Sequence, residues 1–389
     1  MIRSVPPLPF LSQPFRPFFL LAALFGGGWM LLWAWFFASG RMPVPGLPSF
    51  VIHGHEMLFG YTGAVLAGFV LTAASNWTGR PTCTRASLSF VVLLWAVARI
   101  GWLMPERLPW LLLAGVDTAF FLVLAGLLAR PIIATANRRN YGFVAIVLAF
   151  AALDSAVLAA MARGELVLAR HLLTATVDLT TLLMAAMGGR VIPFFTERRL
   201  PGASVRRRPR LGHAALALLA ALLAVDLAAP GSASAAALEL LAGVLLFANL
   251  VGWWDRRVLA EPMLWILHLG YAWLPAGLIL RAVATLTGAF PDTTAFHAIT
   301  VGALGCLTLG MLARVALGHT GRPIAADGFI TTAFTFMALA APVRLAAALP
   351  MPPALVTTLL SISGVIWTMA FVLYLVRFVP IVIAPRQTA

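Results

Sequence analysis

The sequence predicts an all-helical membrane protein that crosses the bilayer twelve times and has no soluble domain. Hydrophobic residues make up 61% of the 389 residues and charged residues only 10%, which is outside the range of soluble globular domains. Apolar runs of about 18 residues or more, long enough to cross the hydrocarbon core, recur along the whole chain. They lack the alternating pattern of a transmembrane barrel, so every span is expected to be a helix.

The apolar runs divide the chain into spans joined by short loops within one membrane domain, residues 1–389. The opening stretch, MIRSVPPLPFLSQPFRPFF, is proline-rich and has no small-residue cleavage site after a short apolar core, so we do not interpret it as a removable signal peptide. The twelve spans are expected at about residues 15–39, 53–76, 86–104, 108–130, 141–162, 167–190, 211–229, 235–254, 259–286, 293–318, 326–348 and 354–379.

The net charge of +14 comes from arginine and follows the loops. With both termini cytoplasmic, most arginines fall in cytoplasmic loops, as insertion into a bacterial cytoplasmic (inner) membrane requires. We therefore interpret the charge as a topology signal and expect no nucleic-acid partner. Two cysteines do not suggest a disulfide framework or a thiolate metal site. The cytoplasmic set includes Arg80, Arg85, Arg138, Arg139, Arg198, Arg199, Arg206, Arg207, Arg208, Arg210, Arg256 and Arg257.

A sequence repeat links the second and tenth spans. HEMLFGYTGAVLAGFVLTAASNWTGRP at 55–81 and HAITVGALGCLTLGMLARVALGHTGRP at 297–323 share a first histidine, glycines at offsets 5, 8 and 13, and a final TGRP. The sixth span keeps only His171 and Thr174 of this pattern. Spans two, six and ten thus begin with histidine. This period of four spans favours a pseudo-threefold arrangement of four-helix units, at about residues 1–130, 131–254 and 255–389.

The six shared glycines allow two interpretations. Without a side chain, each lets either a neighbouring helix or a flat ligand approach the backbone closely. The glycines are Gly60, Gly63, Gly68, Gly302, Gly305 and Gly310.

The histidines at the predicted periplasmic ends of spans are candidate metal ligands, because histidine is rare in hydrocarbon and neutral imidazole binds haem iron, copper and zinc. The alternative is that they cap helices or line the interface. We expect His55 and His297 to hold a haem between spans two and ten. His53 lies about 200° from His55 on a helix, so one of them would serve the haem and the other a second metal, with His171 as a further candidate. Without CxxCH or HExxH, covalent haem c and that zinc site are excluded.

A second polar group is predicted at the cytoplasmic side. An anion, a quinone head group or lipid phosphate would explain it, and so would ordinary interface histidines and snorkelling arginines. Its members are His268, His319, Arg190, Arg314 and Arg322, and the two histidines are further candidate metal ligands.

Acidic residues inside apolar spans are candidates for proton transfer, since an unpaired carboxylate there must be protonated or find a cation. Arg99 is the expected partner of Asp117. Glu56 and Asp178 are the candidate catalytic residues, as proton relays or as groups that orient a ligating histidine. Ion pairs or interhelical hydrogen bonds are the alternative, also for Asp154 and Glu239.

Several motifs together resemble the NnrS family: FRPFFLLA from Phe15, HGHEMLFGY from His53, GGRVIPFFT from Gly188, HLGYAWLPAGL from His268, and the two repeat copies. Ile52 departs from the tryptophan that usually precedes HxHE. The resemblance implies a twelve-span protein of the bacterial cytoplasmic membrane with haem and copper, linked to nitric oxide metabolism and protection from nitrosative stress. Arg16, in the first motif, is our further candidate for cofactor binding.

The placement of histidines on spans two, six and ten also resembles the catalytic subunit of haem-copper oxidases and nitric oxide reductases. There, histidines of helices two and ten hold a haem and one of helix six holds copper, but the paired histidines expected on helix seven are absent here.

These observations lead us to expect a haem b protein, with copper as a second metal, that binds and reduces nitric oxide near the periplasm. Electrons would come from membrane quinol or a soluble donor, and lipid is the other expected partner. A non-enzymatic nitric oxide sensor or scavenger, or a haem or copper handling protein, is the competing hypothesis.

Overall fold

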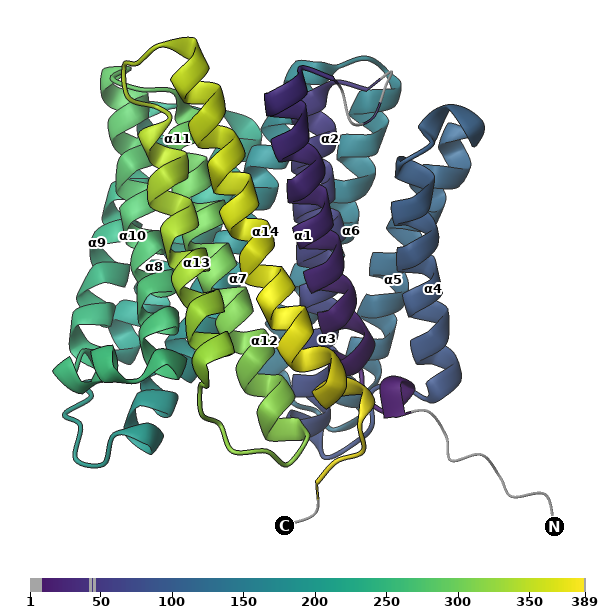
Figure 1. Ribbon diagram of the computed structural model, residues 1–389, viewed down its shortest axis with the longest axis vertical. Helices are drawn as coiled ribbons and strands as arrows, with labels where there is room; N and C mark the ends of the chain where they lie inside the picture. The colour runs from purple at the N-terminus through teal and green to yellow at the C-terminus, as the bar shows by residue number, and fades with distance from the viewer. Residues whose placement is uncertain (1–8, 42–43, 45–46, 388–389) are drawn as a thin grey trace.

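The computed structural model describes residues 9–41, 44 and 47–387, which form one bundle of long helices (Figure 1). Twelve helical stretches in it are long and apolar enough to cross a membrane, and no strand occurs in the described part. This confirms the predicted all-helical, multi-pass class. The first helix begins at Phe15, as predicted, whereas residues 1–8 of the proline-rich opening stretch lie outside the described residues.

The spans correspond closely to the predicted ranges. Two of them, the second and the tenth, are each divided by a π-helical segment into three consecutive parts. In order the elements are α1 (Phe15–Ser39), α2 (Ser49–His55) with η2 (Glu56–Tyr61) and α3 (Thr62–Thr78), α4 (Arg85–Trp102), α5 (Trp110–Ala134), α6 (Tyr141–Ala162), α7 (Leu166–Arg199), α8 (Pro209–Ala228), α9 (Ala233–Trp253), α10 (Pro262–Thr287), α11 (Asp292–His297) with η6 (Ala298–Leu304) and α12 (Gly305–His319), α13 (Gly328–Ala346), and α14 (Pro353–Ile383).

The largest difference from the predicted ranges is at the end of α7. The sixth span was expected to stop at 190, where apolar residues give way to arginine, but the helix continues through Pro193 to Arg199. A proline removes one backbone hydrogen bond without ending a helix whose neighbours support it. The extra turns carry Arg198 and Arg199, which reach past the apolar region. Hydropathy marks where a span leaves the hydrocarbon, not where its helix ends.

The three spans that begin with histidine form the inside of the bundle. Of their most apolar 18 residues, 83%, 67% and 78% are buried in spans two, six and ten, while the highest value among the other spans is 61%. α7 contacts α2, η2 and η6, so the three inner spans meet near their histidines. We call this side of the bundle the histidine end.

The first and last spans close the ring of outer helices. α1 packs along α14 and also against α3 (Figure 1). The guanidinium of Arg16 donates hydrogen bonds to the carbonyl oxygens of Val382 and Ala384, so the start of α1 and the end of α14 lie at the same end of the bundle, opposite the histidine end.

The two repeat copies adopt the same local structure. Each has a π-helical segment directly after its repeat histidine, in which backbone hydrogen bonds join residues five apart instead of four. Each ends at the glycine of TGRP, which has the left-handed conformation, with φ of 66° at Gly79 and 74° at Gly321. A proline follows two residues later. The motif TGRP is therefore a helix terminator. Within its described residues, α7 has no π-helical segment.

The six repeat glycines pack helices together. At every one of them an added Cβ would lie within 3.1 Å of a side chain from another helix. At Gly68 the nearest atoms would be those of Phe19, at 2.8 Å, and the Cβ of Phe18, at 2.9 Å. The helix-packing interpretation is the one that the structure supports, because none of these glycines lines the large cavity described below.

Replacing Gly68 by alanine is expected to destabilise the protein by about 1–3 kcal/mol, because the new methyl group would press on Phe18 and Phe19 and push α1 away from α3. The measurement is thermal unfolding in detergent, followed by tryptophan fluorescence. Gly28→Ala is the matched control: nothing lies within 4 Å of its Cβ position, and alanine favours helix. Equal behaviour of the two variants would contradict the packing role.

Candidate functional site

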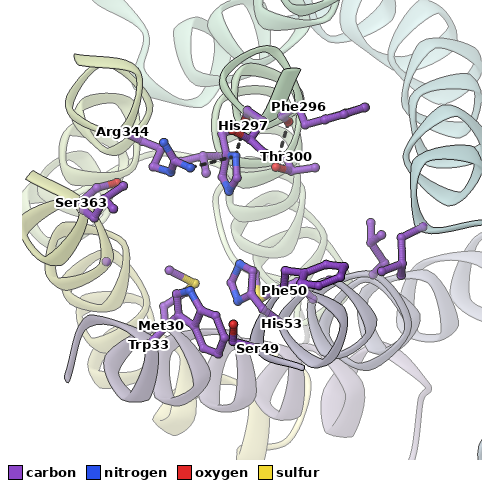
Figure 2. Close-up of a pocket in the computed structure, with 18 of the residues that line it drawn as sticks. Met30, Trp33, Ser49, Phe50, His53, Phe296, His297, Thr300, Arg344 and Ser363 are labelled. Atoms are coloured by element: carbon purple, nitrogen blue, oxygen red, sulfur yellow. Dashed lines mark hydrogen bonds between the residues drawn. The ribbon is translucent and has the colours of Figure 1, made fainter. Parts of the chain in front are cut away.

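A cavity of about 380 Å³ lies at the histidine end, among spans one, two, six, ten, eleven and twelve. Its walls are mainly aromatic and aliphatic, and they include two histidines (Figure 2). The imidazole of His53 from α2 and that of His297 from α11 face each other across it. A mostly apolar cavity with a few converging polar groups is the usual form of a ligand or cofactor site. We call it the histidine cavity.

The ring of His297 is held in one tautomer. Its Nδ1 lies 2.5 Å from the carbonyl oxygen of Thr293, one turn earlier in α11, and donates its hydrogen to that oxygen. A ring nitrogen that carries hydrogen cannot also accept one, so the nearby guanidinium of Arg344, 3.3 Å from Nδ1, contributes charge rather than a hydrogen bond. The lone pair of His297 is therefore on Nε2. This is the arrangement of a metal-ligating histidine, in which a backbone carbonyl sets the tautomer.

The ring of His53 is oriented by stacking. It lies against the indole of Trp33 with ring centres 4.4 Å apart and planes 20° from parallel. Its Nδ1 is buried and has no hydrogen-bond partner among the described residues. A buried imidazole nitrogen without a partner is costly, so the Nδ1 of His53 is available to bind a ligand.

Two arginines line the histidine cavity, Arg170 and Arg344, and Arg344 is the one beside His297. It lies near the end of α13 and lines the cavity, and no carboxylate of the described residues forms an ion pair with it. An arginine inside a span normally pairs with an acid or faces water. Its position beside two histidines suits an anionic group on a bound ligand, for which a guanidinium offers a planar pair of donors.

His55 does not line the histidine cavity. It was expected to share a haem with His297, but α2 points His53 to the cavity and turns His55 to the opposite side. There its Nδ1 lies 2.9 Å from Glu56 and its Nε2 lies 3.1 Å from Asp154. Both nitrogens face carboxylate oxygens, so neither has a free lone pair directed at a metal.

Around His55 is a buried ion cluster built by spans two to five. Arg99 of α4 donates to Glu56 at 2.6 Å and to Asp117 of α5, and Asp154 of α6 completes the group. The predicted pair of Arg99 with Asp117 is confirmed. Glu56, a predicted proton relay, thus lies in an ion pair away from the cavity, although its Oε2 has no described partner.

The oxygen and nitrogen atoms of His55, Glu56 and Asp117 lie close enough together, within 4.8 Å, to hold a metal ion. However, Arg99 already donates to both carboxylates. Its guanidinium supplies the positive charge that a metal would bring, so the cluster is complete as an ion network.

A second ion cluster repeats this plan in spans six to nine. Arg281 of α10 pairs with Asp178 of α7, with Asp226 of α8 at 2.7 Å and with Glu239 of α9 at 3.0 Å. Asp178, the other predicted relay, is therefore an ion-pair partner and does not line the histidine cavity. The first cluster joins spans two to five and the second joins spans six to nine, and the histidine cavity lies beside both, with spans two and six contributing to its walls.

A polar cavity of about 450 Å³ adjoins the histidine cavity. It is lined by His171, Asp226, Glu239 and Arg281. Both cavities share the side chains of a thin wall. His171 thus faces the second ion cluster rather than His53 and His297. The wall residues are Phe50, Arg170, Thr174 and Phe296.

The remaining predicted ligands lie elsewhere. His268 is buried in α10 with its Nδ1 3.1 Å from the carbonyl of Leu264. His319 lies at the opposite end of the bundle from the histidine end, against Phe15, with ring centres 5.6 Å apart. Arg16 binds the carbonyls at the end of α14. None of the three lines the histidine cavity.

Arg344, Met30 and Trp33 line the cavity but were missed as site residues. A signal existed for Arg344, because it is an arginine within a predicted span. Met30 and Trp33 belong to an apolar, aromatic run that looks like any lipid-facing or packed segment, so no sequence signal separates them.

Residues 9–386 match the model of a protein family described as NnrS protein. The chain belongs to the NnrS family. This match covers nearly the whole sequence and confirms the resemblance drawn from the motifs. A comparison with curated proteins returns no match. Membership of the NnrS family fits a membrane protein related to nitric oxide.

Removing the cation of the second ion cluster should strongly destabilise the protein. Arg281→Gln leaves three buried carboxyl groups without their guanidinium, which is expected to cost about 3–5 kcal/mol. Chemical or thermal unfolding in detergent measures this loss. Arg163→Gln, which breaks an exposed pair with Glu165, is the matched control and should leave the unfolding transition unchanged. Similar transitions for both variants would refute the structural role.

Proposed function

We propose that this NnrS protein binds haem b in the histidine cavity and that nitric oxide binds and is reduced there, which relieves nitrosative stress. The observation that carries the proposal is the pair of imidazoles, His53 and His297, that face each other inside an aromatic cavity (Figure 2). Bound haem would supply an iron centre that takes nitric oxide and passes electrons to it.

The lining of the cavity fits this cofactor in three respects. Aromatic rings, among them Trp33, Phe296 and Trp367, suit a flat apolar macrocycle. Arg344 has no carboxylate partner among the described residues and would bind an acidic substituent of the porphyrin. The buried Nδ1 of His53 and the free Nε2 of His297 are the nitrogen donors that iron requires.

The two histidines are not equivalent. His297 has its tautomer set by Thr293 and would be the firmly held ligand. His53 rests on Trp33 by stacking, its Nδ1 has no described hydrogen-bond partner, and it would be the less firmly held ligand. This assignment replaces His55 with His53 as the partner of His297.

Reduction of nitric oxide consumes protons, and the polar cavity offers a source for them. Its wall is shared with the histidine cavity, and its lining includes the ionisable groups of His171 and Glu239. The Oε2 of Glu239 is buried without a described partner, so this oxygen is free to take up and release a proton. Asp178 does not line the polar cavity and would act on Glu239 through Arg281, with which both carboxyl groups pair. Membrane quinol or a soluble donor would supply the electrons, at the predicted periplasmic side of the cytoplasmic membrane.

The variants His297→Ala and His53→Ala should differ in absorption spectra of the purified protein. His297→Ala is expected to lose most bound haem, measured as pyridine haemochrome per protein. His53→Ala should keep haem but change its spin state, because one of the two nitrogen ligands would be removed. His213→Ala, an exposed histidine, is the control and should match the wild type. Full haem and an unchanged spectrum in both cavity variants would refute the assignment.

Turnover separates an enzyme from a protein that only traps the gas. With a reductant and no oxygen, the wild type is expected to consume nitric oxide well beyond one equivalent per haem, and Glu239→Gln should slow consumption several-fold while haem content stays the same. A nitric oxide electrode measures both. Uptake that stops at one equivalent would eliminate the reductase and leave the sensor or scavenger.

The second candidate function is copper handling. The thioethers of Met30 and Met57 line the histidine cavity together with the two imidazoles, and this mixed set suits cuprous copper. Metal analysis of Met30→Leu discriminates the two: a copper site would lose its metal, whereas a haem site would keep its iron.

A further inference from the structure

A second apolar cavity lies along the inner spans, further from the histidine end than the histidine cavity. It measures about 90 Å³ and is lined by the three inner spans and by Leu267 of α10. On each inner span its lining begins about one turn beyond the lining of the histidine cavity. In span two Leu58 lines the histidine cavity and Thr62 the second one, and in span six the corresponding residues are Val177 and Thr180. In span ten Val301 lines the histidine cavity and Leu307 the second one. Leu304, the last residue of the second π-helical segment, lines both cavities. We call this space the axial cavity.

The axial cavity offers water no hydrogen-bond donor and few acceptors. Its only hydroxyl groups belong to three threonines, and each already donates to a backbone carbonyl of its own helix: Thr62 to Met57 at 2.9 Å, Thr180 to Thr176 at 2.7 Å, and Thr308 to Leu304 at 2.6 Å. The hydroxyl of Tyr61 engages Thr308 from outside, at 2.6 Å. Every other lining residue is apolar or a glycine. A cavity of this kind stays dry and admits apolar guests.

Its size limits the guest to a very small molecule. About 90 Å³ is well below the roughly 300 Å³ at which sites for drug-sized ligands or cofactors begin, so the cavity does not enclose a quinone ring or a porphyrin. It is several times the roughly 10–15 Å³ that one water-sized guest needs. A diatomic gas meets both limits.

We propose that the axial cavity is a binding site for a small uncharged gas molecule, which it holds on the far side of Leu304 from the histidine cavity. That this gas is nitric oxide rests on the proposed function. The site itself rests only on the geometry and chemistry of its lining. Leu304 is the side chain that the gas would pass to reach His53 and His297.

Xenon, an apolar atom of similar size, is the probe. Crystals of the full-length protein pressurised with xenon are expected to show one anomalous peak between Thr180, Leu304 and Thr308. Because xenon needs neither haem nor electrons, this result does not depend on whether the protein reduces nitric oxide.

Two variants fill the cavity from different helices. Val65→Phe on α3 and Val191→Phe on α7 each place a ring where the xenon would lie, and both should abolish the peak. Two variants protect the test against a folding defect in either one, which thermal unfolding would reveal. Val372→Phe, the same change at an exposed position of α14, is the matched control and should keep the peak.

Four outcomes would overturn the proposal: an empty cavity in the wild type under xenon pressure, ordered water in the cavity, an acyl chain inserted between the inner helices, or a peak that survives in both filled variants. If xenon binds as expected but the protein consumes no nitric oxide, the gas site stands and the proposed reductase fails.

Discussion

The hydrocarbon core of a membrane offers no hydrogen-bond partner, and this constraint shapes the whole bundle. Every buried polar group must find its partner within the protein. Two guanidinium groups, those of Arg99 and Arg281, each draw carboxyl groups from neighbouring spans into a closed ion cluster. These clusters bring four consecutive spans to one point and so link helices that apolar contacts alone would align only loosely.

Three polar groups that this constraint leaves without a full set of partners lie together. Arg344 has no described carboxylate partner, His53 has a bare ring nitrogen, and His297 directs its lone pair away from its own helix. All three line one cavity at the histidine end. The carboxyl groups of the two clusters are paired with guanidinium groups, whereas Arg344 and the two imidazoles of the cavity have no carboxylate partner among the described residues, which is the physical reason for placing a ligand there.

The inner spans supply both the rigid frame and the spaces within it. Repeat glycines bring neighbouring helices into contact, and the π-helical segments after His55 and His297 change the direction of the residues that follow. Leu304 ends one of these segments and forms the wall between the histidine and axial cavities. The same local distortion therefore has a cavity histidine at its start and the residue that lines both cavities at its end.

The sequence by itself determined the number of spans, their approximate limits, the family, and the histidines and acids to be explained, because hydropathy and motif spacing are properties of each segment alone. Only the tertiary structure decided which side each group faces. His53 and His55 are two residues apart, and nothing in HGHE shows which one meets His297; the rotation of α2 against its neighbours decides it. Likewise, the ion pairs that Glu56 and Asp178 form with Arg99 and Arg281 depend on how separate spans are placed side by side. The positions of Met30 and Trp33 at the cavity could not be foreseen, since an apolar side chain carries no mark of what it packs against.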